Sequence, residues 1–176
     1  MLTLKRLYLY TVLGISLVAL LMGLSDVVRF ALDRISDTLA SRTYISDDLL
    51  GELSWAIALV IVAVPVFLVH LALVRRSLQG PAAAVADERA CASRSTYFFL
   101  VLTGTGVVAA TQLTDLLQSA IGTVAFGERA WSLAAAVAGS IIVGGAWLAH
   151  VWVRRSDLWA APERTAGDWL TRAYLY

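Results

Sequence analysis

The sequence has 176 residues, of which 59% are hydrophobic and only 15% are charged, and its formal net charge is +1. Soluble domains contain about 45–50% apolar and about 25% charged residues, so this composition is typical of an integral membrane protein. The basic residues form no run with interleaved aromatic residues, which argues against nucleic-acid binding. Cys91 is the only cysteine, which excludes an internal disulfide and a cysteine-based metal site.

Four segments are long and apolar enough to cross a bilayer, which takes about 20 mostly apolar residues in a helix. The first follows Lys5 and Arg6, as in a signal peptide, but it is longer than the usual core of about 7–15 residues and no cleavage site follows, so we expect a retained helix. This helix should continue past the membrane or bend along its surface. Pro65 lies inside the second segment and should weaken or kink that helix. The predicted spans are 7–30, 53–74, 97–121 and 131–153.

The basic residues predict how these spans are oriented. Four crossings place the N-terminus, the middle loop and the C-terminus on one side, and that side carries all but four of the 14 lysines and arginines. The positive-inside rule therefore predicts that both termini are cytoplasmic. The four exceptions are Arg29, Arg34, Arg42 and Arg129.

The sequence also predicts an internal repeat. The segment around Tyr8 recurs 89 positions later around Tyr97, and the segment around His70 recurs 80 positions later around His150. Both copies of the second segment end in Arg-Arg-Ser. Since both copies begin on the same side of the membrane, they are parallel repeats. The predicted units are a first hairpin at 1–80, a second hairpin at 81–160, and a remainder at 161–176 that is either a cytoplasmic tail or the start of a third repeat, because Arg172, Tyr174 and Tyr176 match Arg6, Tyr8 and Tyr10.

These motifs resemble the DUF5671 family of uncharacterised bacterial membrane proteins. The resemblance rests on Arg6-Leu7-Tyr8-Leu9-Tyr10, on His70 before Arg75-Arg76, and on His150 before Arg154-Arg155. The second copy departs from the opening motif, with Ser95-Thr96 where Arg-Leu stands in the first. The resemblance implies an all-α bundle of repeated transmembrane hairpins in a bacterial cytoplasmic (inner) membrane, and it implies no chemistry.

His70 and His150, the only histidines, occupy equivalent places near the inner ends of the second and fourth spans. We expect each to bond to a backbone carbonyl or a lipid headgroup. The alternative is a pair of axial ligands for a haem or a bacteriochlorophyll, because imidazole is a good ligand for such metals. No cofactor is needed to explain either residue.

Asp26 and Asp115 are a second equivalent pair, toward the outer ends of the first and third spans. A carboxylate within a membrane is costly and often marks a site of function. Solvation at the helix end, or pairing of Asp26 with Arg29, explains them more simply. The alternative is a cation or proton path lined by Asp26, Asp115 and the threonines of the third span.

Small residues recur at every fourth position in the third and fourth spans, which should let these two helices approach closely. No catalytic motif, such as a nucleophile with its base or a phosphate-binding loop, occurs in the sequence, so we do not expect an enzyme. The small residues are Gly106, Ala110 and Thr114 in the third span and Ala136, Ser140 and Gly144 in the fourth.

Three functions follow from these patterns. The expected one is a non-catalytic membrane subunit that lies in the lipid bilayer and packs against other membrane proteins or further copies of itself, as in an energy-transducing or other multisubunit complex. The second is a small transporter or channel module. The third is an electron-transfer protein that binds a haem or pigment through His70 and His150.

Overall fold

The computed structural model describes residues 2–39, 47–126 and 130–160, which are helical except at 78–81 and at Cys91. No strand occurs in these ranges, so the predicted all-α class is confirmed. The helices are α1 (Leu2–Leu39), α2 (Asp47–Ser77), α3 (Ala82–Ala90), α4 (Ala92–Phe126) and α5 (Ala130–Ala160).

Within the described part of the chain, α1, α2, α4 and α5 are long and apolar enough to cross a membrane. An α-helix rises about 1.5 Å per residue, so about 20 residues match the hydrocarbon core. Each helix extends beyond its predicted span. The first helix was expected either to continue or to bend, and α1 continues without a break to Leu39. The spans are Leu4–Leu32, Leu50–Ser77, Ala92–Phe126 and Leu133–Ala160.

A short helix between the hairpins, α3, was not predicted. Its N-cap is Pro81, whose carbonyl accepts a hydrogen bond from the Val85 N–H at 3.0 Å. A proline at this end costs no helical hydrogen bond, because the first N–H groups of a helix have no partner within it. Only Cys91, in an extended conformation, separates α3 from α4. This abrupt turn fixes the direction of α3 relative to α4, and so directs Glu88 into the protein, where it is buried.

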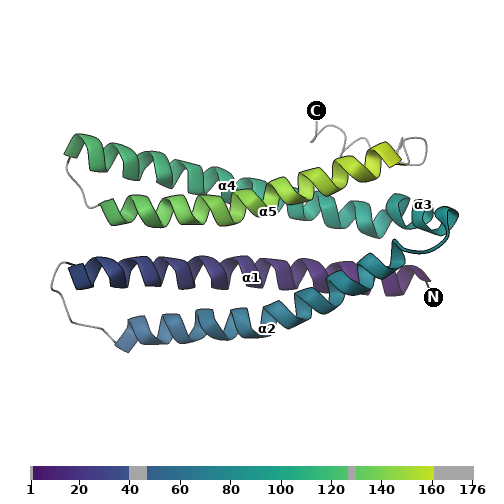
Figure 1. Cartoon of the computed structure of the whole chain (residues 1–176), viewed down its shortest axis with the longest axis horizontal. Helices are drawn as coiled ribbons and strands as arrows, with labels where there is room; N and C mark the ends of the chain where they lie inside the picture. Colours follow the sequence, from purple (N-terminus) through teal and green to yellow (C-terminus); the bar gives the residue numbers. More distant parts are fainter. Residues whose placement is uncertain (1, 40–46, 127–129, 161–176) are drawn as a thin grey trace.

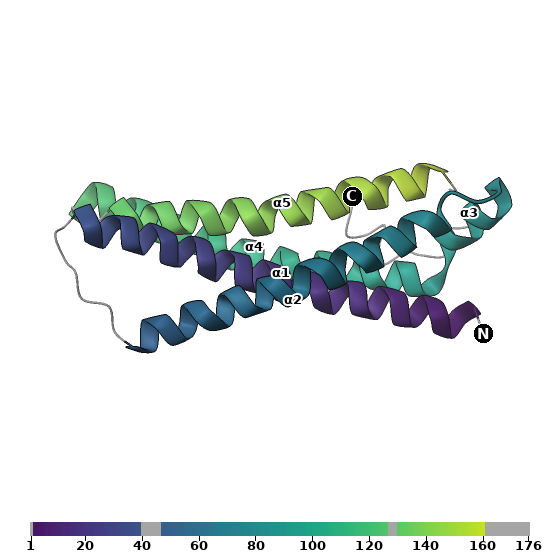
Figure 2. The same cartoon turned by 60° about the horizontal axis from the view of Figure 1, so that its bottom comes forward.

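The helices form two antiparallel hairpins that lie side by side (Figure 1). α1 packs along α2, and α4 packs along α5. The hairpins meet because α1 also packs on α5 and α4, whereas α2 packs chiefly on α1. The start of α1, α3 and the last turn of α5 gather at one end, which we call the α3 end (Figures 1 and 2). α2 changes direction along its length, as Pro65 in its middle predicts (Figure 1).

The buried core lies in the half of the bundle nearer the α3 end. Large apolar and aromatic side chains from all four long helices meet there, while elsewhere many large apolar side chains are exposed. Such an outer surface suits contact with lipid or with another membrane protein. The core residues are Tyr10, Leu13, Leu17, Val74, Tyr97, Phe98, Val101, Leu102 and Leu158.

Each hairpin has one point where a glycine lets its two helices approach. In the first hairpin, a Cβ on Gly23 of α1 would lie 2.9 Å from the Ala56 carbonyl oxygen and 3.0 Å from the Leu59 Cβ of α2. In the second, a Cβ on Gly139 of α5 would lie 2.5 Å from the Gln112 Oε1 of α4. Gln112 stands 89 positions after Gly23, and Gly139 stands 80 positions after Leu59. The glycine is therefore on the first helix in one hairpin and on the second helix in the other.

Candidate functional site

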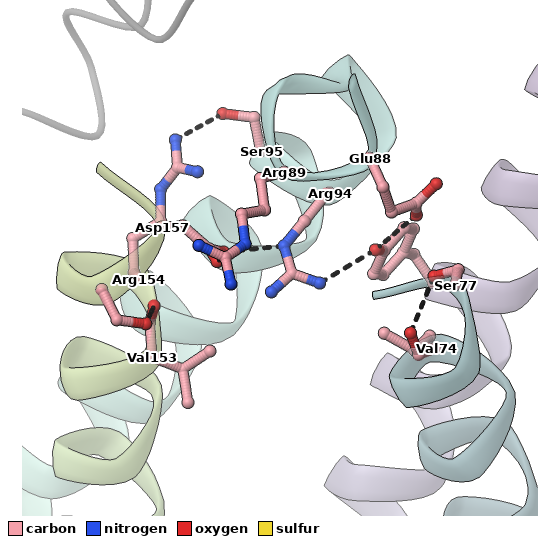
Figure 3. Close-up of polar contacts among 11 residues, drawn as sticks. Val74, Ser77, Glu88, Arg89, Arg94, Ser95, Val153, Arg154 and Asp157 are labelled. Carbon is pink, nitrogen blue, oxygen red and sulfur yellow. Dashed lines mark hydrogen bonds and ion pairs between the residues drawn. The ribbon is translucent and has the colours of Figure 1, made fainter. Parts of the chain in front are cut away.

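Charged side chains from α3, α4 and α5 meet at the α3 end (Figure 3), and Arg6 of α1 joins them through Glu88. Glu88 of α3 is one centre of this ionic network. Its Oε2 accepts a hydrogen bond from Arg6 Nε at 2.7 Å, and its Oε1 accepts one from the Tyr10 hydroxyl at 2.8 Å. Arg6 also bonds through Nη2 to Asp87 Oδ2 at 2.8 Å. α1 is thereby tied to α3.

Asp157 of α5 is the second centre of the network. Its Oδ2 accepts a hydrogen bond from Arg94 Nε at 2.7 Å, and its Oδ1 lies 3.7 Å from Arg89 Nε. Arg94 also donates from Nη1 to the Tyr10 hydroxyl at 3.1 Å. Because Tyr10 donates to Glu88 and accepts from Arg94, the two carboxylate centres belong to one continuous chain of hydrogen bonds.

The centre of this network is almost completely buried. The exposed fractions are 3% for Arg94, 2% for Asp157 and 7% for Glu88. Removing one partner of a buried ion pair costs about 3–5 kcal/mol, since the remaining charge stays in a medium of low polarity. The network therefore restricts how α1, α3, α4 and α5 can move relative to one another.

A fourth arginine borders the network beside an aromatic ring. Arg154 of α5 is buried and donates from Nη2 to the Ser95 hydroxyl of α4 at 3.0 Å. The guanidinium carbons of Arg94 and Arg154 lie 5.2 and 5.7 Å from the centre of the Phe98 ring. Both distances are within cation–π range, which helps to offset the burial of these two positive charges.

The two histidines each contact a tyrosine of the preceding helix. His150 Nδ1 lies 2.7 Å from the Ala146 carbonyl oxygen, and its Nε2 lies 2.9 Å from the Tyr97 hydroxyl. A carbonyl can only accept, so Nδ1 carries a proton, and when the ring is neutral Nε2 accepts from the Tyr97 hydroxyl. Both ring nitrogens of His150 are thus engaged within the protein.

The first hairpin has a similar arrangement. His70 Nδ1 lies 2.8 Å from the carbonyl oxygen of Val66, and the His70 and Tyr8 ring centres are 5.8 Å apart. The corresponding Tyr97–His150 distance is 5.9 Å. Bonding of each histidine to the carbonyl four residues earlier agrees with the expected backbone contact. Among the described residues, no group of three or more His, Cys, Asp or Glu side chains is placed to hold a metal ion.

The aspartates singled out in the sequence lie away from the network. Asp26 of α1 and Asp115 of α4 are both exposed on the outside of their helices, in the part of the bundle that lies toward the end opposite α3. The polar site of this protein therefore consists of other residues.

The small residues divide into two groups. Ala136 is buried, and Ser140 donates to the Gln112 carbonyl oxygen at 3.4 Å, so these two lie at the crossing of α4 and α5. Ala110 and Thr114 are exposed. Gly106 and Gly144 are partly buried, and a Cβ on Gly144 would meet no atom within 4 Å.

Sequence reasoning missed the ionic network. Its arginines serve in the sequence as evidence for orientation, for the repeat and for the family resemblance, and Glu88 and Asp157 are not singled out. One signal was present: Asp87-Glu88-Arg89 places two acids among the basic residues of the predicted cytoplasmic side. Pairing with nearby arginines explains why acidic residues occur on this otherwise basic side.

Comparison with known proteins identifies a family. The model of the domain of unknown function DUF5671 matches residues 6–130, from Arg6 of the network to the start of α5. Comparisons with curated proteins and with solved structures found no match. The matched range covers more than half of the chain, so the protein belongs to the DUF5671 family.

Proposed function

For this DUF5671 member, we propose that the chain is a non-catalytic integral membrane subunit that packs against partner membrane proteins. The observation that carries the proposal is the separation of polar side chains, which lie together at the α3 end, from apolar side chains, which face outward along the spans. The polar groups of the site bond to one another, as Arg6, Glu88, Tyr10, Arg94 and Asp157 do. The groups that face outward along the spans are largely apolar. A protein built in this way offers surfaces for packing.

The contacts of the histidines and aspartates support this proposal over the alternatives. A haem ligated by His150 through Nε2 would have to displace the hydrogen bond from Tyr97. A cation path through Asp26 and Asp115 would have to lie on the outer surfaces of α1 and α4, where these carboxylates are exposed. In the described part of the chain, no group of three or more His, Cys, Asp or Glu side chains adds a metal or cation site to either alternative.

We also propose that the two hairpins are copies of one unit, with both termini on the cytoplasmic side of a bacterial inner membrane. The equivalent Tyr–His contacts, and the equivalent hydrogen bonds to the carbonyls of Val66 and Ala146, support the repeat. The basic residues at the α3 end support the orientation.

Purification from native membranes tests the proposed function. A tagged chain extracted together with surrounding lipid is expected to carry other membrane polypeptides, or further copies of itself, in a fixed ratio measured by quantitative mass spectrometry. The same preparation should be colourless in the Soret region. A monomer alone in lipid would contradict the proposal, as would a haem spectrum that His150→Ala abolishes.

A further inference from the structure

Two helices of the bundle have a neighbour that their counterparts lack. If the hairpins are copies of one unit, α1 corresponds to α4 and α2 corresponds to α5. α1 packs on α2, α4 and α5, whereas α4 has α1 and α5 as its long neighbours. α5 packs on α4 and α1, whereas α2 packs chiefly on α1. The contact between α1 and α5 thus has no developed counterpart between α4 and α2.

The exposed side chains of α4 show which surface this leaves open. Four residues along α4 are exposed at spacings of 4, 3 and 4, so they lie on one helix face. Their counterparts in α1, 89 positions earlier, are all partly buried. The exposed residues are Ala110, Thr114, Leu117 and Ile121, and the counterparts are Leu21, Ser25, Val28 and Leu32.

α2 shows the complementary difference. Trp55, Ala58 and Val62 are exposed on one face of α2, with exposed fractions of 65% for Trp55 and 64% for Val62. The counterparts in α5, 80 positions later, are all partly buried, and they are Ala135, Ala138 and Ile142. The lower exposure of these residues in α1 and α5 agrees with the contact between α1 and α5, which has no developed counterpart between α4 and α2.

Both open faces lie at the same level of the bundle. Gly23 meets α2 at Ala56 and Leu59, and its counterpart Gln112 meets α5 at Gly139. The α2 face around Ala58 and the α4 face beginning at Ala110 therefore both lie beside these crossings, away from the α3 end. They could meet without a shift along the membrane normal.

We propose that these two faces bind each other between copies of this chain, with α2 of one copy packing on α4 of the next as α5 packs on α1 within the chain. This inference rests on the proposed packing function and names its partner as a second copy. The argument for a copy is continuity: one chain carries both halves of a contact that it already makes once internally. Small side chains on both faces, Ala58, Ala110 and Thr114, allow close van der Waals packing, which drives helix association in lipid.

The proposed contact joins different surfaces of the two copies. Such a heterologous interface produces a closed ring, or an open row if the rotation between copies does not close. This predicts a specific cross-linking pattern, in which α2 pairs with α4 and neither helix pairs with itself.

Disulfide cross-linking in membranes tests the pattern. Copies with Ala58→Cys and copies with Thr114→Cys, both with Cys91→Ser and distinguishable tags, are expressed together and oxidised. Mixed dimers should exceed those of a control pair by about tenfold, since a specific contact holds the thiols at a high effective concentration. The control pair is Ile57→Cys with Asp115→Cys, which lie beside the test positions but on other helix faces, and which are exposed as their counterparts Val137 and Asp26 are.

A second variant guards against effects of the introduced thiols. Ala110→Trp should reduce the copy number per particle in lipid nanodiscs, whereas Thr111→Trp should not, since Thr111 and its counterpart Met22 are both exposed. Equal cross-linking of test and control pairs, or no effect of Ala110→Trp, would overturn the inference. A fixed unlike subunit without a second copy overturns the inference and leaves the proposed function intact, whereas a monomer alone contradicts both.

Discussion

At the scale of single residues, Arg94 is the side chain that joins the two carboxylate centres at the α3 end. It binds Asp157 of α5 through Nε and the Tyr10 hydroxyl of α1 through Nη1. The cost of burying its charge is offset because each contact is a charge-assisted hydrogen bond, which is stronger than a neutral one. Its position near the end of a span also keeps this charge away from the middle of the bilayer, where burial costs most.

We predict that Asp157→Asn destabilises the protein by about 3–5 kcal/mol, because Arg94 and Arg89 lose their buried counter-charge. Thermal unfolding in detergent, followed by circular dichroism, measures the change. The matched control Asp115→Asn, at an exposed position, should change stability by less than about 0.5 kcal/mol. Equal effects of the two substitutions would show that the network contributes little.

Cys91 allows a pH-dependent prediction at the same end of the molecule. Partial burial raises the pKa of its thiol, because burial disfavours the thiolate. Alkylation at neutral pH should therefore be slower than for an exposed thiol such as Gln79→Cys in a Cys91→Ser chain. The rate should continue to rise above the ordinary thiol pKa of about 8.5, which a pH series with a maleimide would measure. Matching pH profiles for the two thiols would refute this.

At the scale of helices, close approach depends on which helix supplies the glycine. Gly23 in α1 receives the bulky Leu59 of α2, while in the second hairpin Gly139 of α5 receives Gln112 of α4. If the hairpins are copies of one unit, the crossing is kept although the glycine lies on the other helix. Comparing the two hairpins for identical residues alone would miss this, because the required property is the combined volume at the crossing.

We predict that Gly23→Ala destabilises the first hairpin by about 1–3 kcal/mol, since its Cβ would lie 2.9 Å from a backbone oxygen that cannot move independently. Gly144→Ala is the control, because a Cβ there meets no atom within 4 Å. It should be neutral or slightly stabilising, as alanine favours the helix. Thermal unfolding of both variants in the same detergent measures the two changes in stability. A loss of stability in Gly144→Ala but not in Gly23→Ala would contradict the prediction.

At the scale of the whole molecule, packing is unequal between the two ends. The core and the ionic network lie toward the α3 end, and many large apolar side chains elsewhere are exposed. The α3 end therefore supplies the buried polar contacts between the hairpins, which also meet where α1 packs on α5. Farther along the bundle lie the open faces of α2 and α4, where we propose that another copy completes the packing.

Orientation in the membrane is predicted at this scale. In a Cys91→Ser chain, Gly51→Cys lies near the end opposite α3, while Gln79→Cys lies at the α3 end, and both positions are exposed. If the α3 end is cytoplasmic, a membrane-impermeant maleimide should label only Gly51→Cys in intact cells. Gln79→Cys should become labelled after permeabilisation. The reverse pattern would place the basic side outside.

The sequence by itself determined the all-α membrane class, the approximate spans and the family resemblance, because these depend on the length, apolarity and local order of residues. The internal repeat and the orientation remain predictions from the same source. Tertiary structure decided how the hairpins join. The bond of Arg94 to Asp157, 63 residues away, and the bond of Arg6 to Glu88, 82 residues away, depend on a one-residue turn at Cys91 and on helix packing. Local sequence patterns do not encode such distant pairings, and for the same reason only the structure revealed that Ala110 and Thr114 face outward.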